Sequence, residues 1–388
     1  MPGAVIESAC WLFKVSSAMR KYEIPSVPGG VFFLYDLFSL RMRRLLVIIG
    51  IFSLSPAGAQ VLGGRSVFNF LRLSHTPQLT ALGGVNISQP SDDIGMTFHN
   101  PALFTSPMHT QVNAVFNDLY GGIKVFHLSL GYHHQPLNTD FTWGLNFFNY
   151  GATTETDAGG NILGKFRPVD WVMQVGASRT YLEKWRYGAN LKFISSNYGL
   201  FRSNGIATDL AILYKDTAKL VTASFLIKNL GVQLRKYNNE QEELPFDLQA
   251  GITKRLSKAP FSFSLTAHRV HQYDILYNDT SFNNSNGYPD VPAGFSAGKL
   301  FDHLILGTTI HVHEKVELQA GYNFLRRREL NIGNSSNGLN GFSLGAGVFL
   351  GKFNLRYARS YYQAASAYNQ IGFNLPLNQY FGQGKSGW

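Results

Sequence analysis

Residues 185–193 read Trp-Arg-Tyr-Gly-Ala-Asn-Leu-Lys-Phe, and every second residue is apolar. The residues between them, Arg186, Gly188, Asn190 and Lys192, are polar or small. A period of two places alternate side chains on opposite faces of a β-strand. This stretch therefore predicts a strand with one apolar face and one polar face.

The same pattern recurs from residue 109 onward, about ten residues at a time, with turns rich in Gly, Asn, Asp or Pro between the repeats. We expect fourteen strands, at residues 109–117, 121–134, 140–151, 169–179, 185–197, 203–215, 220–230, 245–255, 260–272, 304–312, 316–325, 340–350, 353–361 and 367–375. Transmembrane strands need about 9–11 residues, whereas strands of globular proteins average about 5–6. A barrel must also close, because lipid does not tolerate exposed backbone edges. The expected fold class is all-β, a 14-stranded transmembrane β-barrel of the outer membrane.

The connections between these strands alternate in length, as they do in outer-membrane barrels. The four long ones, 152–168, 231–244, 273–303 and 326–339, all fall at the same end, which we take as the outer end. We expect residues 299–303 to form a short helical turn that leads into the tenth strand. Aromatic residues near strand ends are expected to form interfacial girdles: Tyr132, Trp143, Tyr150, Trp171, Trp185, Tyr198, Tyr214, Tyr357 and Tyr361.

The composition excludes several other protein classes. Only 15% of the 388 residues are charged, against about 25% in an average globular chain, which argues against an ordinary cytosolic enzyme. The hydrophobic share of 45% and the aromatic share of 14% argue against disorder. Beyond the N-terminal region no apolar run reaches the roughly 18 residues of a membrane-spanning helix.

A targeting signal is predicted at residues 42–59. Met42-Arg43-Arg44 forms a short basic n-region, residues 45–54 form an apolar h-region, and Ala57 and Ala59 provide a small-residue cleavage site before Gln60. The mature protein is therefore expected to begin at Gln60.

Residues 1–41 precede a complete signal, and we interpret them as a non-native upstream extension from a start codon assigned too early. A real cytoplasmic extension is the alternative. The single cysteine, Cys10, lies in this segment, and a mature chain without cysteine fits a bacterial envelope protein. Six basic and three acidic residues precede Gln60, so the net charge falls from +10 to +7. This modest excess suits lipopolysaccharide or an acidic partner and does not by itself indicate nucleic acid.

Residues 60–108 do not alternate, and we predict that they form an N-terminal hatch in the lumen of the barrel at 109–388. An exposed periplasmic arm is the alternative. The lumen is favoured because many apolar residues of this segment need burial: Phe68, Phe70, Leu71, Leu73, Leu79, Leu82, Ile87, Met96, Phe98, Leu103 and Phe104.

Three short motifs in this segment resemble the hatch of the FadL-like outer-membrane family, in which Asn-Pro-Ala follows a Gly-rich, Asp-containing stretch. They are Ala81-Leu82-Gly83-Gly84, Asp92-Asp93 and Phe98-His99-Asn100-Pro101-Ala102. The residues that the resemblance marks as the hatch motif are Gly83, Gly84, Asp92, Asp93, Asn100, Pro101 and Ala102.

Within that superfamily, residues 68–73, 82–88, 321–330 and 341–343 are similar to the PorV/PorQ group of the Bacteroidota type IX secretion system. The resemblance implies a non-enzymatic outer-membrane component of the attachment complex. Its partners would be PorZ-like, PorU-like and PorV-like proteins, which join secreted cargo to surface lipopolysaccharide. The alternative is a FadL-like channel for hydrophobic small molecules, which requires an apolar pocket in the lumen and a lateral opening in the barrel wall.

The sequence carries no enzyme, metal or cofactor signature. His311 and His313 lack a third ligand nearby, and no Gly-x-Ser-x-Gly elbow is present. Arg326, Arg327 and Arg328 form the densest charge cluster of the mature chain, at the start of an outer loop. They are candidates to contact an acidic partner or lipopolysaccharide phosphates. The alternative is that these arginines are ordinary solvent-exposed charges at the base of the loop.

Overall fold

The computed structural model describes residues 66–238, 240–276, 281, 284–285, 296–330, 338–361 and 367–381. The predicted extension at 1–41, the signal peptide at 42–59 and the cleavage residues Ala57, Ala59 and Gln60 lie outside the described residues, as do hatch residues 60–65. These assignments stay predictions.

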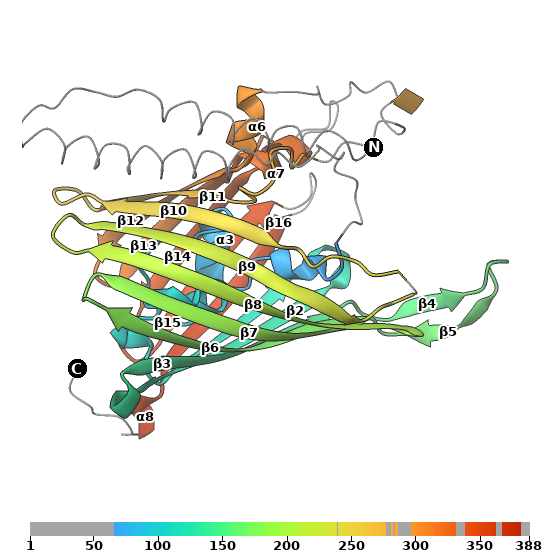
Figure 1. Ribbon diagram of the computed structural model, residues 1–388, viewed down its shortest axis with the longest axis horizontal. Helices are drawn as coiled ribbons and strands as arrows, with labels where there is room; N and C mark the ends of the chain where they lie inside the picture. Colours follow the sequence, from blue (N-terminus) through green and yellow to red (C-terminus); the bar gives the residue numbers. More distant parts are fainter. Residues whose placement is uncertain are drawn as a thin grey trace, which may run out of the picture. The chain divides into compact units, whose positions relative to one another are not determined.

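Fourteen antiparallel strands close into a barrel among the described residues, as the alternation predicted (Figure 1). They are β1 (Gln111–Asp118), β2 (Lys124–His134), β3 (Thr139–Asn149), β6 (Val169–Tyr181), β7 (Trp185–Tyr198), β8 (Phe201–Asp216), β9 (Val221–Arg235), β10 (Asp247–Arg255), β11 (Phe261–Ala267), β12 (Leu304–His313), β13 (Val316–Asn323), β14 (Phe342–Phe349), β15 (Asn354–Tyr361) and β16 (Ala367–Pro376). The first and last strands close the ring, with Gln111 opposite Pro376 and Asp118 opposite Asn369.

The two faces of the wall differ as the period of two requires. In β7, Leu191 is 58% exposed on the outside, whereas its neighbour Asn190 is 1% exposed in the lumen. A closed barrel with an apolar outer face satisfies every wall backbone group while presenting hydrocarbon-compatible side chains to lipid. The chain is a multi-pass β-barrel of the outer membrane. No helix in the described ranges has the length and apolar character needed to cross a membrane.

The long connections all leave one end of the barrel, which is the outer end by the usual rule for these proteins. The first contains a hairpin that the sequence did not predict, β4 (Thr153–Thr156) paired with β5 (Ile162–Phe166). This hairpin projects beyond the wall (Figure 1). The third leads into α6 (Ala297–Asp302), which confirms the helical turn expected at 299–303. The fourth begins with α7 (Phe324–Glu329), and α8 (Asn378–Phe381) follows the last strand.

Two predicted strands are too long by a few residues, for local reasons. The strand expected at 260–272 ends at Ala267, because Arg269 adopts a left-handed φ of 52° that breaks the ladder. The strand expected at 316–325 ends at Asn323, whose side chain accepts a hydrogen bond from the Arg326 N–H (2.9 Å) and caps α7.

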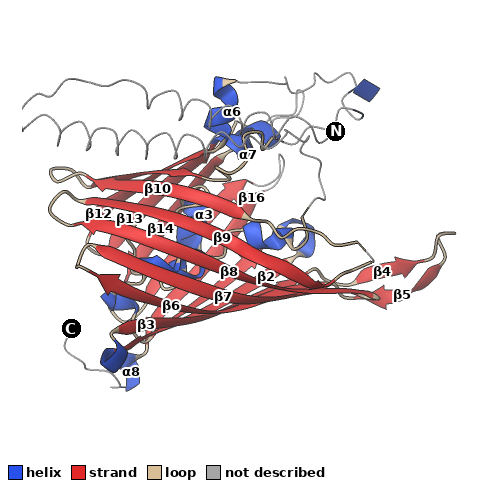
Figure 2. Cartoon of the chain, in the orientation of Figure 1, coloured by secondary structure: helices blue, strands red, loops and turns tan. Residues whose placement is uncertain are grey.

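The hatch residues from Ser66 to Met108 fold inside the ring of strands as short helical turns (Figure 2). These are η1 (Asn69–Arg72), α3 (Pro77–Ala81), α4 (Met96–His99), η2 (Pro101–Leu103) and η3 (Ser106–Met108); η4 (Tyr120–Gly122) and η5 (Gln135–Leu137) belong to barrel connections. The apolar residues predicted to need burial are buried, except Leu73, which is partly buried. The described part of the predicted hatch therefore lies in the lumen.

Candidate functional site: the hatch, the outer mouth and the projecting hairpin

The Asn-Pro-Ala motif fastens the hatch to the wall. Asn100 caps η2, since its Oδ1 accepts the Ala102 N–H (2.9 Å). Its Nδ2 donates to the Ile87 carbonyl (2.7 Å) and to Ser224 Oγ of β9 (3.0 Å). Pro101 lies against Gly188 of β7, where an added Cβ would come within 2.9 Å of the proline. Both polar atoms of the Asn100 side chain therefore have partners, and the motif holds the hatch to the wall.

Asp92 and Asp93 bind the wall from the inner, short-turn end of the lumen. Asp93 is fully buried and accepts hydrogen bonds from Thr76 Oγ1 and Asn374 Nδ2, both at 2.8 Å. Asp92 pairs with Arg356 of β15, a guanidinium that is 2% exposed. Glu317 of β13 also lies 3.5 Å from Arg356. A buried charge requires such partners, so this pairing holds the hatch against the wall.

Gly83 and Gly84 follow α3, and both have a φ of +93°, a left-handed conformation that favours glycine. Gly83 also meets β13 at close range, because a Cβ on Gly321 would lie 2.2 Å from the Gly83 nitrogen. The Gly83 carbonyl accepts a hydrogen bond from Asn323 Nδ2 (3.1 Å). The glycines thus let two backbones touch where hatch and wall meet.

The three consecutive arginines lie on α7 but do not point together at an outer partner. Arg326 turns into the lumen and donates to Ser360 Oγ (2.8 Å) and to the Gly83 carbonyl (3.1 Å). Arg328 pairs with Asp302 of α6. Arg326 therefore joins loop, wall and hatch. The helix sends successive side chains in different directions, and the predicted contact of the three arginines with an acidic partner or lipopolysaccharide stays a prediction.

A buried polar cluster that the sequence did not reveal joins the hatch to β7, β8 and β9. Lys228 Nζ lies 2.6 Å from Nδ1 of hatch residue His99, and Lys192 Nζ lies 2.6 Å from Asp209 Oδ2. Asn229, with a φ of 56°, forms a bulge and accepts from Lys192 at 2.8 Å. Burial, followed by the charge of Lys228, holds the pKa of His99 well below its usual value. The neutral ring can then accept a hydrogen bond from Lys228 Nζ.

The outer mouth contains a cavity of about 610 Å³ between the start of the hatch and the ends of β3, β6 and β7. Tyr150 and Tyr198 were expected in a lipid-facing girdle. Both instead donate hydrogen bonds to Asp170 Oδ2, at 2.6 and 3.0 Å. Phe68 and Phe70 of the hatch form another side of this cavity. The mouth cavity is therefore mixed, with aromatic rings around a carboxylate.

The projecting hairpin exposes large apolar side chains. Ile162 and Leu163 of β5 are 75% and 64% exposed, and Leu200 and Phe201, at the neighbouring turn between β7 and β8, are 85% and 53% exposed. Phe166 packs on that turn, since a Cβ on Gly199 would lie 3.3 Å from its ring. We call Ile162, Leu163, Leu200 and Phe201 the outer apolar patch.

The tip of this hairpin is ordered by its own polar residues. Asp157 Oδ1 accepts backbone N–H groups of Gly159 (2.9 Å) and Asn161 (2.8 Å). The hydrogen bonds from Asn161 also lower the pKa of the Asp157 carboxyl. The hairpin is thus held in a defined shape even though it lies outside the wall.

No group of three His, Cys, Asp or Glu residues stands close enough to hold a metal ion in the described part of the chain. His311, one of the two histidines considered from the sequence, instead lies 3.2 Å from Ser262 Oγ.

Solved outer-membrane barrels are similar to this chain in structure. The toluene transporter TodX of P. putida has a TM-score of 0.42 and 12% identity, covering 78% of this chain and 97% of the other. A FadL homologue of Pseudomonas aeruginosa has a TM-score of 0.42 and 10% identity, covering 82% of this chain and 100% of the other. No protein-family model and no curated protein sequence matches the chain.

Proposed function

We propose that this barrel is a non-enzymatic outer-membrane anchor that holds partner proteins of a type IX secretion attachment complex, in the manner of PorQ. The sequence resemblance to the PorV/PorQ group suggested the role. Partners of the PorZ, PorU and PorV kinds would bind at the outer loops while cargo is joined to lipopolysaccharide. The anchor supplies position and binding surface, and no chemistry.

The outer apolar patch is the observation that carries the proposal. Large apolar side chains on an aqueous outer loop cost free energy unless a partner covers them, and exposed apolar patches commonly mark protein interfaces. Leu200 is the most exposed of the four at 85%. The ordered hairpin tip limits the entropy lost when a partner binds.

The filled lumen is consistent with an anchor. The hatch meets the wall through close backbone contact at Gly321 and through the Asp92–Arg356 ion pair at the inner end. β3 pairs without a register shift with both β2 and β6, so this part of the wall has no strand break that would open it sideways.

The test is a patch variant, Ile162→Asp with Leu163→Asp, compared with Thr154→Asp on the exposed face of the same hairpin. The barrel is purified from cells in mild detergent, and its partners are identified by mass spectrometry. We expect the double variant to keep a heat-modifiable barrel in the membrane, to lose its partner and to reduce surface cargo. Thr154→Asp should retain both. Normal cargo and an unchanged partner in the double variant would contradict the proposal.

Trimming the loops at 273–303 or 326–339 extends the same test to the other outer connections. Partner loss without barrel loss is the expected result.

The second candidate function is a channel for hydrophobic small molecules, and the mouth cavity of about 610 Å³ favours it. Its volume falls in the range of roughly 300–1,000 Å³ typical of small-molecule sites. A channel predicts that bulky substitution beside Asn100 stops uptake of a hydrophobic solute while the hairpin variants do not. The anchor predicts the reverse effect on cargo display.

A further inference from the structure

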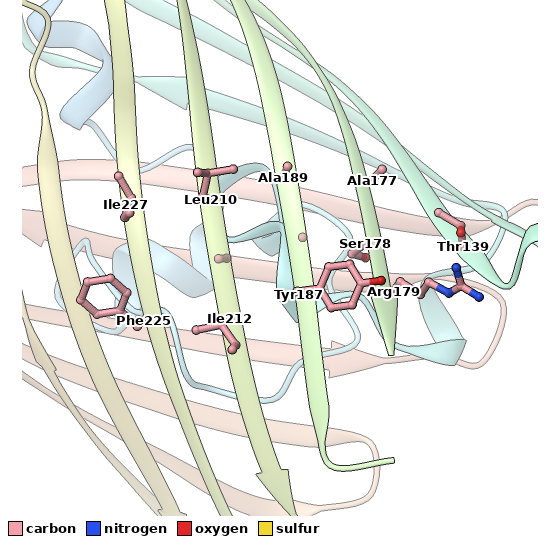
Figure 3. A pocket seen from close by; sticks show the side chains of 12 residues that line it. Thr139, Ala177, Ser178, Arg179, Tyr187, Ala189, Leu210, Ile212, Phe225 and Ile227 are labelled. Atoms are coloured by element: carbon pink, nitrogen blue, oxygen red, sulfur yellow. The ribbon is translucent and has the colours of Figure 1, made fainter. Parts of the chain in front are cut away.

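A groove on the outer wall of the barrel, unrelated to the hatch or the loops, spans β6 to β9 (Figure 3). Its volume is about 620 Å³. Two rows of outward side chains line it, as the strand register requires. The upper row is Ala177, Ala189, Leu210 and Ile227, and the lower row is Arg179, Tyr187, Ile212 and Phe225.

The groove exists because two small residues stand together among large ones. Ala177 and Ala189 face each other across β6 and β7. The next outward pair toward the outer end, Val175 and Leu191, is 51% and 58% exposed. The outer surface of the wall is therefore recessed at the alanine pair, and the strand backbone forms the bottom of the groove.

One cationic side chain lies at the edge of this groove. Arg179 faces Tyr187 in the register, and its side chain is exposed on the outside of the wall. No carboxylate of the described residues forms an ion pair with it. Tyr187 is 49% exposed beside it, and Figure 3 shows the two side chains next to each other, below the alanines. A guanidinium on a lipid-facing wall is stabilised by an anionic group of the membrane within its reach.

The depth of Arg179 identifies which part of the membrane that partner comes from. β6 ends at Tyr181, two residues beyond Arg179, a step of roughly 7 Å along a strand. Tyr181 is opposite Trp185, whose ring packs in a tilted arrangement against Tyr214 at 4.9 Å between centroids. These rings form an aromatic belt at the short-turn, periplasmic end. Arg179 thus lies at the level of the periplasmic leaflet, where lipid phosphates occur.

We propose that this groove binds one glycerophospholipid of the periplasmic leaflet. The phosphate accepts paired hydrogen bonds from Arg179, which arginine geometry favours, and Tyr187 donates beside it. One acyl chain lies over Ala177 and Ala189, where the depressed wall gives it more contact than the flat wall does. The outer leaflet, which carries lipopolysaccharide, lies at the opposite end of these strands.

The test uses native mass spectrometry of the detergent-purified barrel with added 1-palmitoyl-2-oleoyl phosphatidylethanolamine. We expect one lipid to stay bound to the wild type. Arg179→Gln removes the charged hydrogen bonds and should weaken retention by about tenfold or more. Ala189→Phe fills the groove and should abolish retention.

The matched control is Ala346→Phe, an outward alanine of β14 on another part of the wall. This variant places the same aromatic ring on the lipid-facing surface and should leave retention of the bound phospholipid unchanged. Heat modifiability of each variant checks that the barrel is folded. Equal retention by Ala189→Phe, Ala346→Phe and wild type would show annular lipid only and overturn the site. Unchanged retention by Arg179→Gln would overturn the phosphate assignment.

Discussion

Replacing Arg356 with Met should destabilise the barrel strongly and loosen the hatch from the wall. The guanidinium is 2% exposed and lies against two carboxylates, Asp92 of the hatch and Glu317 of β13. Removing it leaves both acids without their cation, and breaking a buried ion pair by removing one partner costs about 3–5 kcal/mol. Asp92 is 34% exposed and regains some hydration. We therefore expect the lower figure, about 3 kcal/mol.

The measurement is urea unfolding of the barrel in detergent, followed by the heat-modifiable band on gels. With a slope of about 2 kcal/mol per molar, a loss of about 3 kcal/mol lowers the midpoint by about 1.5 M. Adding Glu317→Gln to Arg356→Met removes one unpaired charge and should recover part of the loss. Lys184→Met removes a cation that is 53% exposed, from a pair with Asp216 at 3.1 Å, and Asp216 keeps hydrogen bonds from Tyr214 and Lys219, so the midpoint should change little. A midpoint for Arg356→Met equal to that of Lys184→Met would refute the reasoning.

Four further predictions concern close packing, the lipid-facing surface, the buried histidines and the processing site. Gly321→Ala should lower the free energy of unfolding by about 1–3 kcal/mol by overpacking, whereas Gly164→Ala in the hairpin, which has open space around it, should not. Leu191→Arg on the lipid face should cost about 2–4 kcal/mol near midplane and block assembly, and Leu200→Arg on the outer turn should be tolerated in a membrane-insertion assay. Burial lowers the pKa values of His75 and His99 well below 6.5, so between pH 6.5 and 5 only the unfolded chain takes up these protons. As the pH falls through this range, the free energy of unfolding should decrease by up to about 1.4 kcal/mol per pH unit for each histidine. His99→Gln should reduce the measured slope. N-terminal sequencing of outer-membrane material should begin at Gln60, and a start well upstream would contradict the predicted cleavage.

The sequence predicted the wall well because alternation is local information. In β7 the alternation of apolar and polar residues predicts which face each side chain occupies, and Asn190 lies in the lumen and Leu191 on the outside as that pattern predicts. The β4–β5 hairpin was missed because its strands do not alternate: residues 153–156 read Thr-Thr-Glu-Thr and have no buried face. A hairpin outside the core has no reason to carry a two-faced pattern.

The site was less predictable, because its contacts join residues that are far apart in the chain. The sequence marked Asn100 through its motif, but it carried no sign that Lys228 would meet His99 across 129 positions. Arg326 was found as part of a charge run, and its inward direction depends on where Asn323 starts α7. Such partners are set by tertiary packing, to which a single sequence gives no direct access.

The balance between anchor and channel depends on what hatch movement would break. Opening the lumen requires separating Asp92 from Arg356, His99 from Lys228, and Asn100 from Ser224. Each separation leaves a polar group unpaired in a confined space, and each costs about 1–3 kcal/mol or more unless water enters. The proposed anchor needs none of these steps, because the outer apolar patch that would meet its partner lies on the β4–β5 hairpin and the β7–β8 turn, outside the lumen. The contacts that raise the free-energy cost of moving the hatch therefore also make the barrel rigid, which suits the proposed anchor.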